Sequence, residues 1–247
     1  MTYYAFLTVF EVKTLNIWQL VIVLKGLLSH KETKLPFKSC TFFHQKMFVL
    51  SKLSSIVRLE PKSFNRPLPD ALSEALNAKL ANKVVKDVGL VISLYDILHI
   101  GESHIMAGDG ASHTKVTFRV LVFRPFIEEV LIGKIKSSNK NGLMLNLGFF
   151  DDIFVPAEAL QQPCRFDESD QVWVWEFPSE DEGHVDLFMD PGEEIRFRVT
   201  SESFVDTSPP GPETKKDIKT EENKPRIPYQ IQASINEPGL GLLSWWN

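Results

Sequence analysis

The chain has 247 residues but only two cysteines, Cys40 and Cys164. Two thiols cannot build a disulfide framework, and they cannot supply the four ligands of a structural zinc site. The simple inference is a reducing compartment, either the cytosol or the nucleus.

An excess of positive charge is also missing. The chain carries 27 lysine and arginine residues against 32 aspartate and glutamate residues, so its formal net charge is −5. A free-standing nucleic-acid-binding protein is usually basic. The acidic balance therefore argues against tight autonomous binding of DNA or RNA. It is compatible with weak, local contact inside a larger assembly.

No hydrophobic run is long enough to predict a membrane span. The apolar stretch at residues 15–28 is shorter than the roughly 20 residues that a span requires, and Lys25 interrupts it. A secretory signal would need a basic start and a small-residue cleavage site, yet residues 1–5 carry no charged side chain. We therefore expect no membrane as a partner.

Signatures of catalysis and of cofactor binding are absent as well. The glycine loop at residues 108–113 has His113 where the dinucleotide-binding pattern needs glycine, and no Gly-Lys-Ser/Thr follows it. The adjacent carboxylates Asp151 and Asp152 would point to opposite faces of a strand, so they do not converge on one substrate. We expect no catalytic residues, no metal ligands and no cofactor.

What the chain does contain is a set of alternating strands at residues 129–160. Two strands flank a short glycine turn, and a third apolar strand follows and ends at Pro156. Asn141-Gly142 is a strong hairpin signal, because both residue types tolerate positive φ. The pattern predicts an OB-fold barrel, a scaffold that often binds single-stranded nucleic acid.

Upstream of the barrel, residues 47–125 have the pattern of a small α+β unit. Strands are predicted over residues 88–95 and 115–123, and the side chains of the second alternate strictly between two faces. Leucines at every fourth position predict an amphipathic helix over residues 70–85, with Asp70 as its N-cap. The predicted fold class is therefore α+β, a small α+β domain followed by an antiparallel barrel.

Pro125 marks the junction with the barrel, which we expect to span residues 126–247. Two alternating strands at residues 171–177 and 185–189 predict a hairpin insertion in it. We expect the last alternating segment, residues 239–246, to complete the barrel, because a barrel left open exposes an edge.

Two segments differ in composition from these domains. Residues 207–226 contain four prolines and almost no apolar side chains, so we expect a disordered loop there. Residues 1–46 hold six lysines and two glutamates, a net charge of +4, and Met47 opens a clean alternating run after them. We expect the folded protein to start at Met47. The first 46 residues are then either a lineage-specific tail or an error in the predicted start of the gene.

Two kinds of side chain on the barrel are candidates for RNA contact. Lys134, Lys136 and Lys140 supply positive charge, and Phe149 and Phe150 offer rings on which bases can stack. In the alternative interpretation the phenylalanines belong to the core or to a partner contact, and the lysines are simply solvated.

Trp173 and Trp175 are candidates for a partner interface. They share one face of their strand by parity. If they are exposed, they form a patch of the kind that marks a protein interface, and if they are buried, they belong to the core.

Segments spread over residues 47–247 together resemble one known family. They lie at residues 79–85, 108–116, 132–136, 147–153, 160–163, 171–176, 192–199, 202–209 and 235–246. Through these segments the chain closely resembles the larger stalk subunit of eukaryotic RNA polymerase III.

The resemblance implies a two-part protein with no catalytic residues of its own. Residues 47–125 would be the tip domain, which docks on the polymerase core. The residues implied in that docking are Gly108, Asp109, Gly110 and Ala111. The barrel, residues 126–247, would lie near the RNA exit path and touch nascent RNA weakly.

The resemblance also implies partners and a location. The family forms a heterodimer with a smaller helical stalk subunit, meets initiation factors, and supports transcription of transfer RNA and other short RNAs in the nucleus. A second interpretation is a free RNA-processing or translation factor on the same OB-fold, since a fold does not fix a function. The tip-like unit argues against it, because a free barrel factor needs no such appendage.

Overall fold

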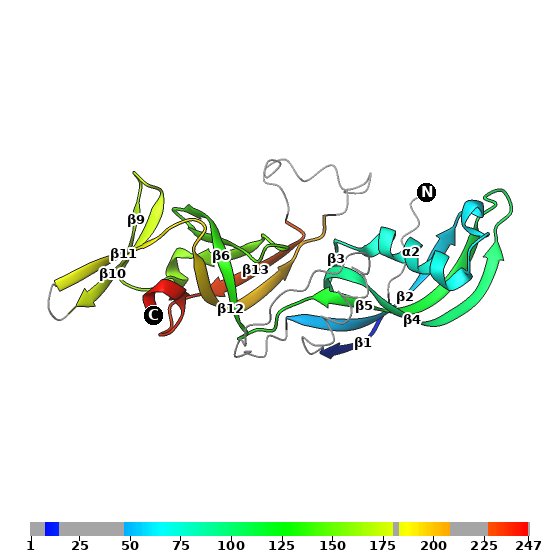
Figure 1. Ribbon diagram of the computed structural model, residues 1–247, viewed down its shortest axis with the longest axis horizontal. Coiled ribbons are helices and arrows are strands. Elements are labelled where there is room, and N and C mark those ends of the chain that lie inside the picture. The colour runs from blue at the N-terminus through cyan, green and yellow to red at the C-terminus, as the bar shows by residue number, and fades with distance from the viewer. Residues whose placement is uncertain (1–7, 15–46, 180–182, 208–226, 247) are drawn as a thin grey trace, which may run out of the picture. The chain divides into compact units, whose positions relative to one another are not determined.

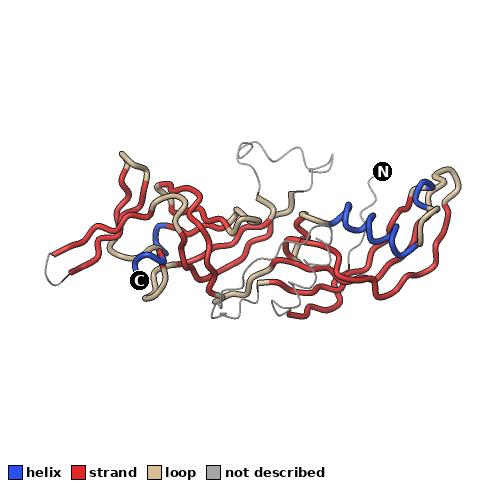
Figure 2. The backbone as a smooth tube through the Cα atoms, viewed as in Figure 1, coloured by secondary structure: helices blue, strands red, loops and turns tan. Residues whose placement is uncertain are grey.

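The structure is a computed structural model that describes residues 8–14, 47–179, 183–207 and 227–246 (Figure 1). The chain divides into two compact units, residues 1–125 and 126–247. The fold class is α+β, as the sequence predicts. Strands dominate the described residues, and one α-helix accompanies them (Figure 2).

The first unit is a five-stranded antiparallel sheet with the helix on one face. Its strands lie in the order β1-β2-β5-β4-β3. The elements are β1 (Thr8–Thr14), β2 (Phe48–Leu59), the 3-10 helix η1 (Pro61–Ser63), α2 (Leu68–Leu80), β3 (Lys83–Val85), β4 (Gly89–Ile105) and β5 (Ser112–Phe123).

Helix α2 forms because its apolar side chains repeat at helical spacing. Ala71, Leu72, Leu76 and Leu80 are buried, and they pack on a core of sheet residues that includes Phe118. This packing provides most of the stability of the helix, since an isolated helix of this length is marginally stable in water.

The predicted ends of the helix are wrong. Pro67 occupies the N-cap position, so Asp70 lies in the first turn and is not the cap. Pro69 is the second residue of the helix, where its fixed φ is already helical, and this favours the earlier beginning. The helix stops at Leu80, and the three residues of β3 pair with β4 instead.

Strand β4 bends around the helix. Its pairing with β5 is interrupted by four register shifts between Val91 and Ser103. Each bulge adds an unpaired residue and increases the local bend and twist. The long β4–β5 hairpin therefore curves along α2, as Figure 2 shows.

Part of the N-terminal extension belongs to this sheet. Strand β1 pairs antiparallel with β2, from Thr8 opposite Ser54 to Thr14 opposite Val49. The expected start of the folded protein at Met47 leaves this strand out.

The second unit contains a closed five-stranded barrel. The strands follow the order β13-β8-β7-β6-β12, and β12 pairs again with β13. They are β6 (Val130–Asn139), β7 (Gly142–Asn146), β8 (Ile153–Pro156), β12 (Glu194–Phe204) and β13 (Tyr229–Ser234). A meander of three strands, closed by a parallel pairing of β8 with β13, is the OB-fold arrangement that the sequence predicts.

The prediction that residues 239–246 complete the barrel is wrong, because β13 closes it. Strand β14 (Gly241–Leu242) has only two residues, pairs with β12, and leads into the 3-10 helix η3 (Leu243–Trp246). The Trp245 ring folds over Gly241, where an added Cβ would lie 2.5 Å from Cζ3 of Trp245. The chain turns there, so no long strand forms.

The predicted β6–β7 hairpin is confirmed, but Gly142 has a different role in it. Asn139 pairs with Gly142, so Lys140 and Asn141 form the loop. Gly142 has φ +146, and an added Cβ would overlap the carbonyl oxygen of Val155 in β8. Glycine is needed here because two backbones approach closely.

An insertion between β8 and β12 forms a separate three-stranded sheet in the order β11-β10-β9 (Figure 1). Its elements are the 3-10 helix η2 (Ala157–Ala159), β9 (Cys164–Asp167), β10 (Val172–Ser179) and β11 (Gly183–Met189). The predicted hairpin is confirmed as β10 and β11, and β9 adds a third strand. Of the predicted disordered loop at 207–226, residues 208–226 lie outside the described residues.

Candidate nucleic-acid interface

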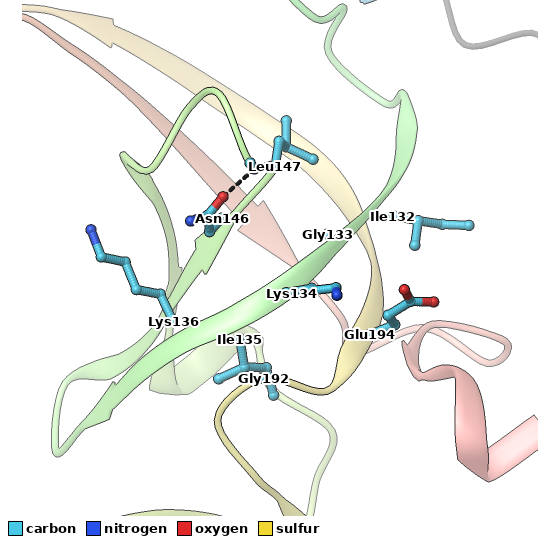
Figure 3. A pocket seen from close by; sticks show the side chains of 10 residues that line it. Ile132, Gly133, Lys134, Ile135, Lys136, Asn146, Leu147, Gly192 and Glu194 are labelled. Atoms are coloured by element: carbon cyan, nitrogen blue, oxygen red, sulfur yellow. Dashed lines mark hydrogen bonds between the residues drawn. The ribbon is translucent and has the colours of Figure 1, made fainter. Parts of the chain in front are cut away.

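An open groove of about 470 Å³ lies on the barrel beside β6 (Figure 3). Three segments meet there, namely β6, the turn after β7, and the turn that leads into β12. The lining residues are Ile132, Gly133, Lys134, Ile135, Lys136, Asn146, Leu147, Gly148, Gly192 and Glu194.

Glycines make this groove possible. An added Cβ at Gly133 would lie 2.9 Å from the carbonyl oxygen of Asn146 and 3.2 Å from Cε1 of Phe197. Gly148 and Gly192 adopt φ of +88° and +94°, conformations that other residues rarely adopt. Much of the groove wall is therefore backbone, which a flat ligand such as a base can approach closely.

Lys134, Lys136 and Lys140 are exposed, as a phosphate contact requires, but carboxylates accompany them. Lys136 Nζ lies 2.8 Å from Oδ2 of Asp151, and Lys140 Nζ lies 2.6 Å from Oε1 of Glu168. The hydrogen bond and the charge of Asp151 raise the pKa of Lys136.

Lys134 has a looser arrangement. It stands opposite Glu194 in the pairing of β6 with β12, and both residues line the groove. The barrel thus offers three lysines to a phosphate backbone, each with an acidic neighbour, and two of them, Lys134 and Lys136, line the groove. Bound phosphates must compete with these carboxylates, so the arrangement favours weak, salt-sensitive contact.

The two phenylalanines differ in exposure. Phe149 is 45% exposed, whereas Phe150 is 6% exposed and packs 5.4 Å from the Tyr229 ring. Phe150 is therefore a core residue, which removes it from the RNA contact candidates. Ile132, 42% exposed beside the groove, is an apolar contact residue that the sequence reasoning missed.

Trp173 and Trp175 are buried, each with 7% exposure. Trp173 Nε1 donates a hydrogen bond to the Asn139 carbonyl oxygen at 2.9 Å. The Trp175 ring packs 4.9 Å from Trp245. These tryptophans join the inserted sheet to the barrel and the C-terminal segment, so they are core residues and not an exposed interface patch.

The glycine loop connects β4 and β5 at the far end of their hairpin. Asp109 accepts hydrogen bonds from Arg58 Nε at 2.9 Å and Nη2 at 2.6 Å, and it lies 2.9 Å from His113 Nε2. These contacts hold the pKa of Asp109 well below its usual range, and the hydrogen bond with Arg58 has the largest effect.

The neighbours of Asp109 in the loop differ from one another. Gly108 and Gly110 have positive φ, with no atom within 4 Å of an added Cβ, whereas Ala111 is fully buried. The loop is therefore anchored through Asp109 and Ala111, and it presents glycine backbone to the outside. Ile105 and Met106, which the sequence reasoning did not single out, are exposed just before it.

Within the described ranges, no group of histidine, cysteine, aspartate and glutamate residues could hold a metal ion. No helix in the described part of the chain is long and apolar enough to cross a membrane.

Comparisons with known proteins match both units. A family model described as "RNA polymerase III subunit Rpc25" matches residues 129–246. A second, described as an SHS2 domain found in the N terminus of Rpb7p and Rpc25p, matches residues 54–110.

Curated relatives match over nearly their whole length. The DNA-directed RNA polymerase III subunit RPC8 of Bos taurus is 55% identical over 202 residues, which cover 81% of this chain and 98% of that protein. The subunit rpc8 of Schizosaccharomyces pombe is 44% identical over 203 residues, 81% of this chain and 100% of its own. The RPC8 subunit of Saccharomyces cerevisiae is 37% identical over 215 residues, with the same coverage.

Proposed function

Because the chain belongs to the RPC8 family of RNA polymerase III subunits, we propose that it is the larger, non-catalytic stalk subunit of that enzyme. In this role it supports initiation of transcription of transfer RNA and other short RNAs in the nucleus. It pairs with the smaller helical stalk subunit and meets initiation factors. The family membership supports this role over that of a free RNA-processing or translation factor.

Docking on the polymerase core is assigned to the loop formed by Gly108, Asp109, Gly110 and Ala111. The fixed conformation of this loop supports the assignment. Arg58 and His113 hold Asp109 in place, so the loop loses little conformational entropy on binding. The open space at both glycines lets a partner reach the backbone. Ile105, 68% exposed, adds an apolar contact beside the loop.

The observation that supports RNA contact is the groove beside β6. It combines lysines on the rim, glycine backbone in the wall and the exposed side chain of Ile132, with the Phe149 ring exposed on the same barrel. Single-stranded RNA is bound by such a pairing of positive charge with surfaces on which bases rest. Since each lysine has an acidic neighbour, the nascent RNA is held weakly.

Purification of the tagged chain tests the subunit role. Polymerase III subunits should co-elute with it, and a preparation that carries ribosomal or RNA-processing proteins instead would refute the role.

The groove is tested in the assembled polymerase with nascent RNA that carries a photoreactive uridine. The change Lys134→Glu with Lys136→Glu should reduce crosslinking of the RNA to this subunit several-fold. The matched control is Lys62→Glu with Lys86→Glu, two exposed lysines of the first unit, which changes the net charge by the same amount. Unchanged crosslinking in the double variant would mean that RNA passes elsewhere on the subunit.

A further inference from the structure

The inserted sheet ends in a strand with a free edge. In the described part of the chain β11 pairs with β10 on one side, and no strand pairs with its other side. Figure 1 shows β10 and β11 extending from the barrel. An edge strand of seven residues presents unpaired N–H and C=O groups to any extended chain that reaches it.

Large apolar side chains are exposed on both faces of this hairpin. Phe177 is 43% exposed and lies opposite Val185, on the face that carries Trp175. Phe188 is 45% exposed and lies opposite Val174, on the other face. These rings offer apolar contact area to a chain that pairs with the edge.

Charge decides what kind of chain fits this edge. Residues 164–190 contain nine aspartate and glutamate residues and one arginine, a net charge of −8. Arg165 is engaged within the sheet, 3.1 Å from Oε1 of Glu176 and 2.5 Å from Oδ2 of Asp186. A second copy of the chain would meet like charge at this edge, and the phosphates of RNA would be repelled as well.

We propose that β11 is a docking edge for an extended, basic segment of another protein, which adds a fourth strand to the β9–β11 sheet. Backbone hydrogen bonds supply part of the affinity in this mode, and alternate side chains supply the specificity. Lysine or arginine side chains of the segment lie on the face of Asp186. The aliphatic side chains between them lie on the face of Val185 and Leu187.

The proposal does not depend on the role in the polymerase, and it can be tested on the full chain alone. The probe is a capped octapeptide of alternating lysine and valine. One control peptide has the same lysines but proline in place of the two central valines, which prevents strand pairing at equal charge. Another has glutamate in place of lysine. Affinity is measured by calorimetry, and the site by amide hydrogen exchange.

The alternating basic peptide should slow amide exchange within residues 183–189 and bind about tenfold more tightly than the proline peptide. The acidic peptide should not bind. Reversing charge with Asp186→Lys and Asp190→Lys should weaken binding several-fold, while Glu158→Lys, an exposed acid in η2, should not.

Three results would overturn the proposal. They are equal binding of the proline peptide, protection that maps outside β11, and no binding of the basic peptide at millimolar concentration. Each can be read from the unmodified chain, so the proposal stays testable even where a variant fails to fold.

Discussion

Removing the carboxylates beside Lys134, Lys136 and Lys140 of the barrel should convert a weak RNA contact into a stronger one. The perturbation is the triple change Asp151→Asn, Glu168→Gln and Glu194→Gln. It keeps the size and shape of each side chain and deletes one negative charge beside each of the three lysines.

The expected size follows from the number of lysines left free to meet phosphate. For single-stranded nucleic acid, log K falls with log salt with a slope of about −0.7 per neutralised phosphate. In the unmodified chain Lys136 and Lys140 are engaged by carboxylates and only Lys134 lacks a close ion pair among the described residues, so the slope should be about −0.7. With all three lysines released the slope should approach about −2, with binding about tenfold tighter at low salt.

Fluorescence anisotropy with a labelled single-stranded RNA, measured from low to moderate potassium chloride, tests this prediction. The matched control is Glu158→Gln, an exposed acid of the same unit that does not line the groove. The reasoning is refuted if the triple variant keeps the slope of the unmodified chain. It is also refuted if the control raises the affinity equally, because net charge and not local pairing would then govern binding.

Three further predictions concern backbone and charge. Gly142→Ala should lower the free energy of unfolding by about 3 kcal/mol, because the added Cβ would overlap the β8 backbone. Gly192→Ala should lower it by only about 1 kcal/mol, because the new side chain has space and only the positive φ is unfavourable. Urea unfolding of the two variants measures the difference. Gly110→Val should weaken co-purification with the polymerase core and leave pairing with the smaller stalk subunit intact, and loss of both would contradict a docking role. The lowered pKa of Asp109 means that its contact with Arg58 stabilises the loop above the ordinary pKa of an aspartate, about 4. That stabilisation should be lost only as pH falls through the lowered pKa, and amide exchange at pH 5 should speed up in Asp109→Asn but not in the unmodified chain.

Local alternation was sufficient to predict most strands of the barrel, and it failed where pairing is distant. Residues 229–235 and 239–246 both alternate, yet only the first segment forms a barrel strand. The difference lies in contacts far along the chain, namely the parallel pairing of Ile231 with Ile153 and the packing of Trp245 over Gly241. Neither contact can be predicted from the alternation of neighbouring residues.

The site shows the same limit at single residues. Phe149 and Phe150 are neighbours of the same type, yet Phe150 packs against Tyr229 and is buried, whereas Phe149 is 45% exposed. The carboxylate beside Lys136 belongs to Asp151 after the next strand, whereas the partner of Lys140 is Glu168 in the inserted sheet. The sequence locates the lysines, but it does not show which carboxylates form ion pairs with them in the folded protein.

Net charge, taken over the whole chain, is a poor guide to this protein's surfaces. The chain carries −5, but residues 164–190 alone carry −8, so the remaining residues together carry +3. The acidity that argues against nucleic-acid binding is thus concentrated in one inserted sheet. The three barrel lysines lie outside that segment, and among the described residues of the segment Glu168 pairs with one of them, Lys140. One subunit can therefore present a weak RNA contact on its barrel and an edge selective for basic protein segments on its insertion, because charge acts over about 8 Å at physiological salt and not over the whole molecule.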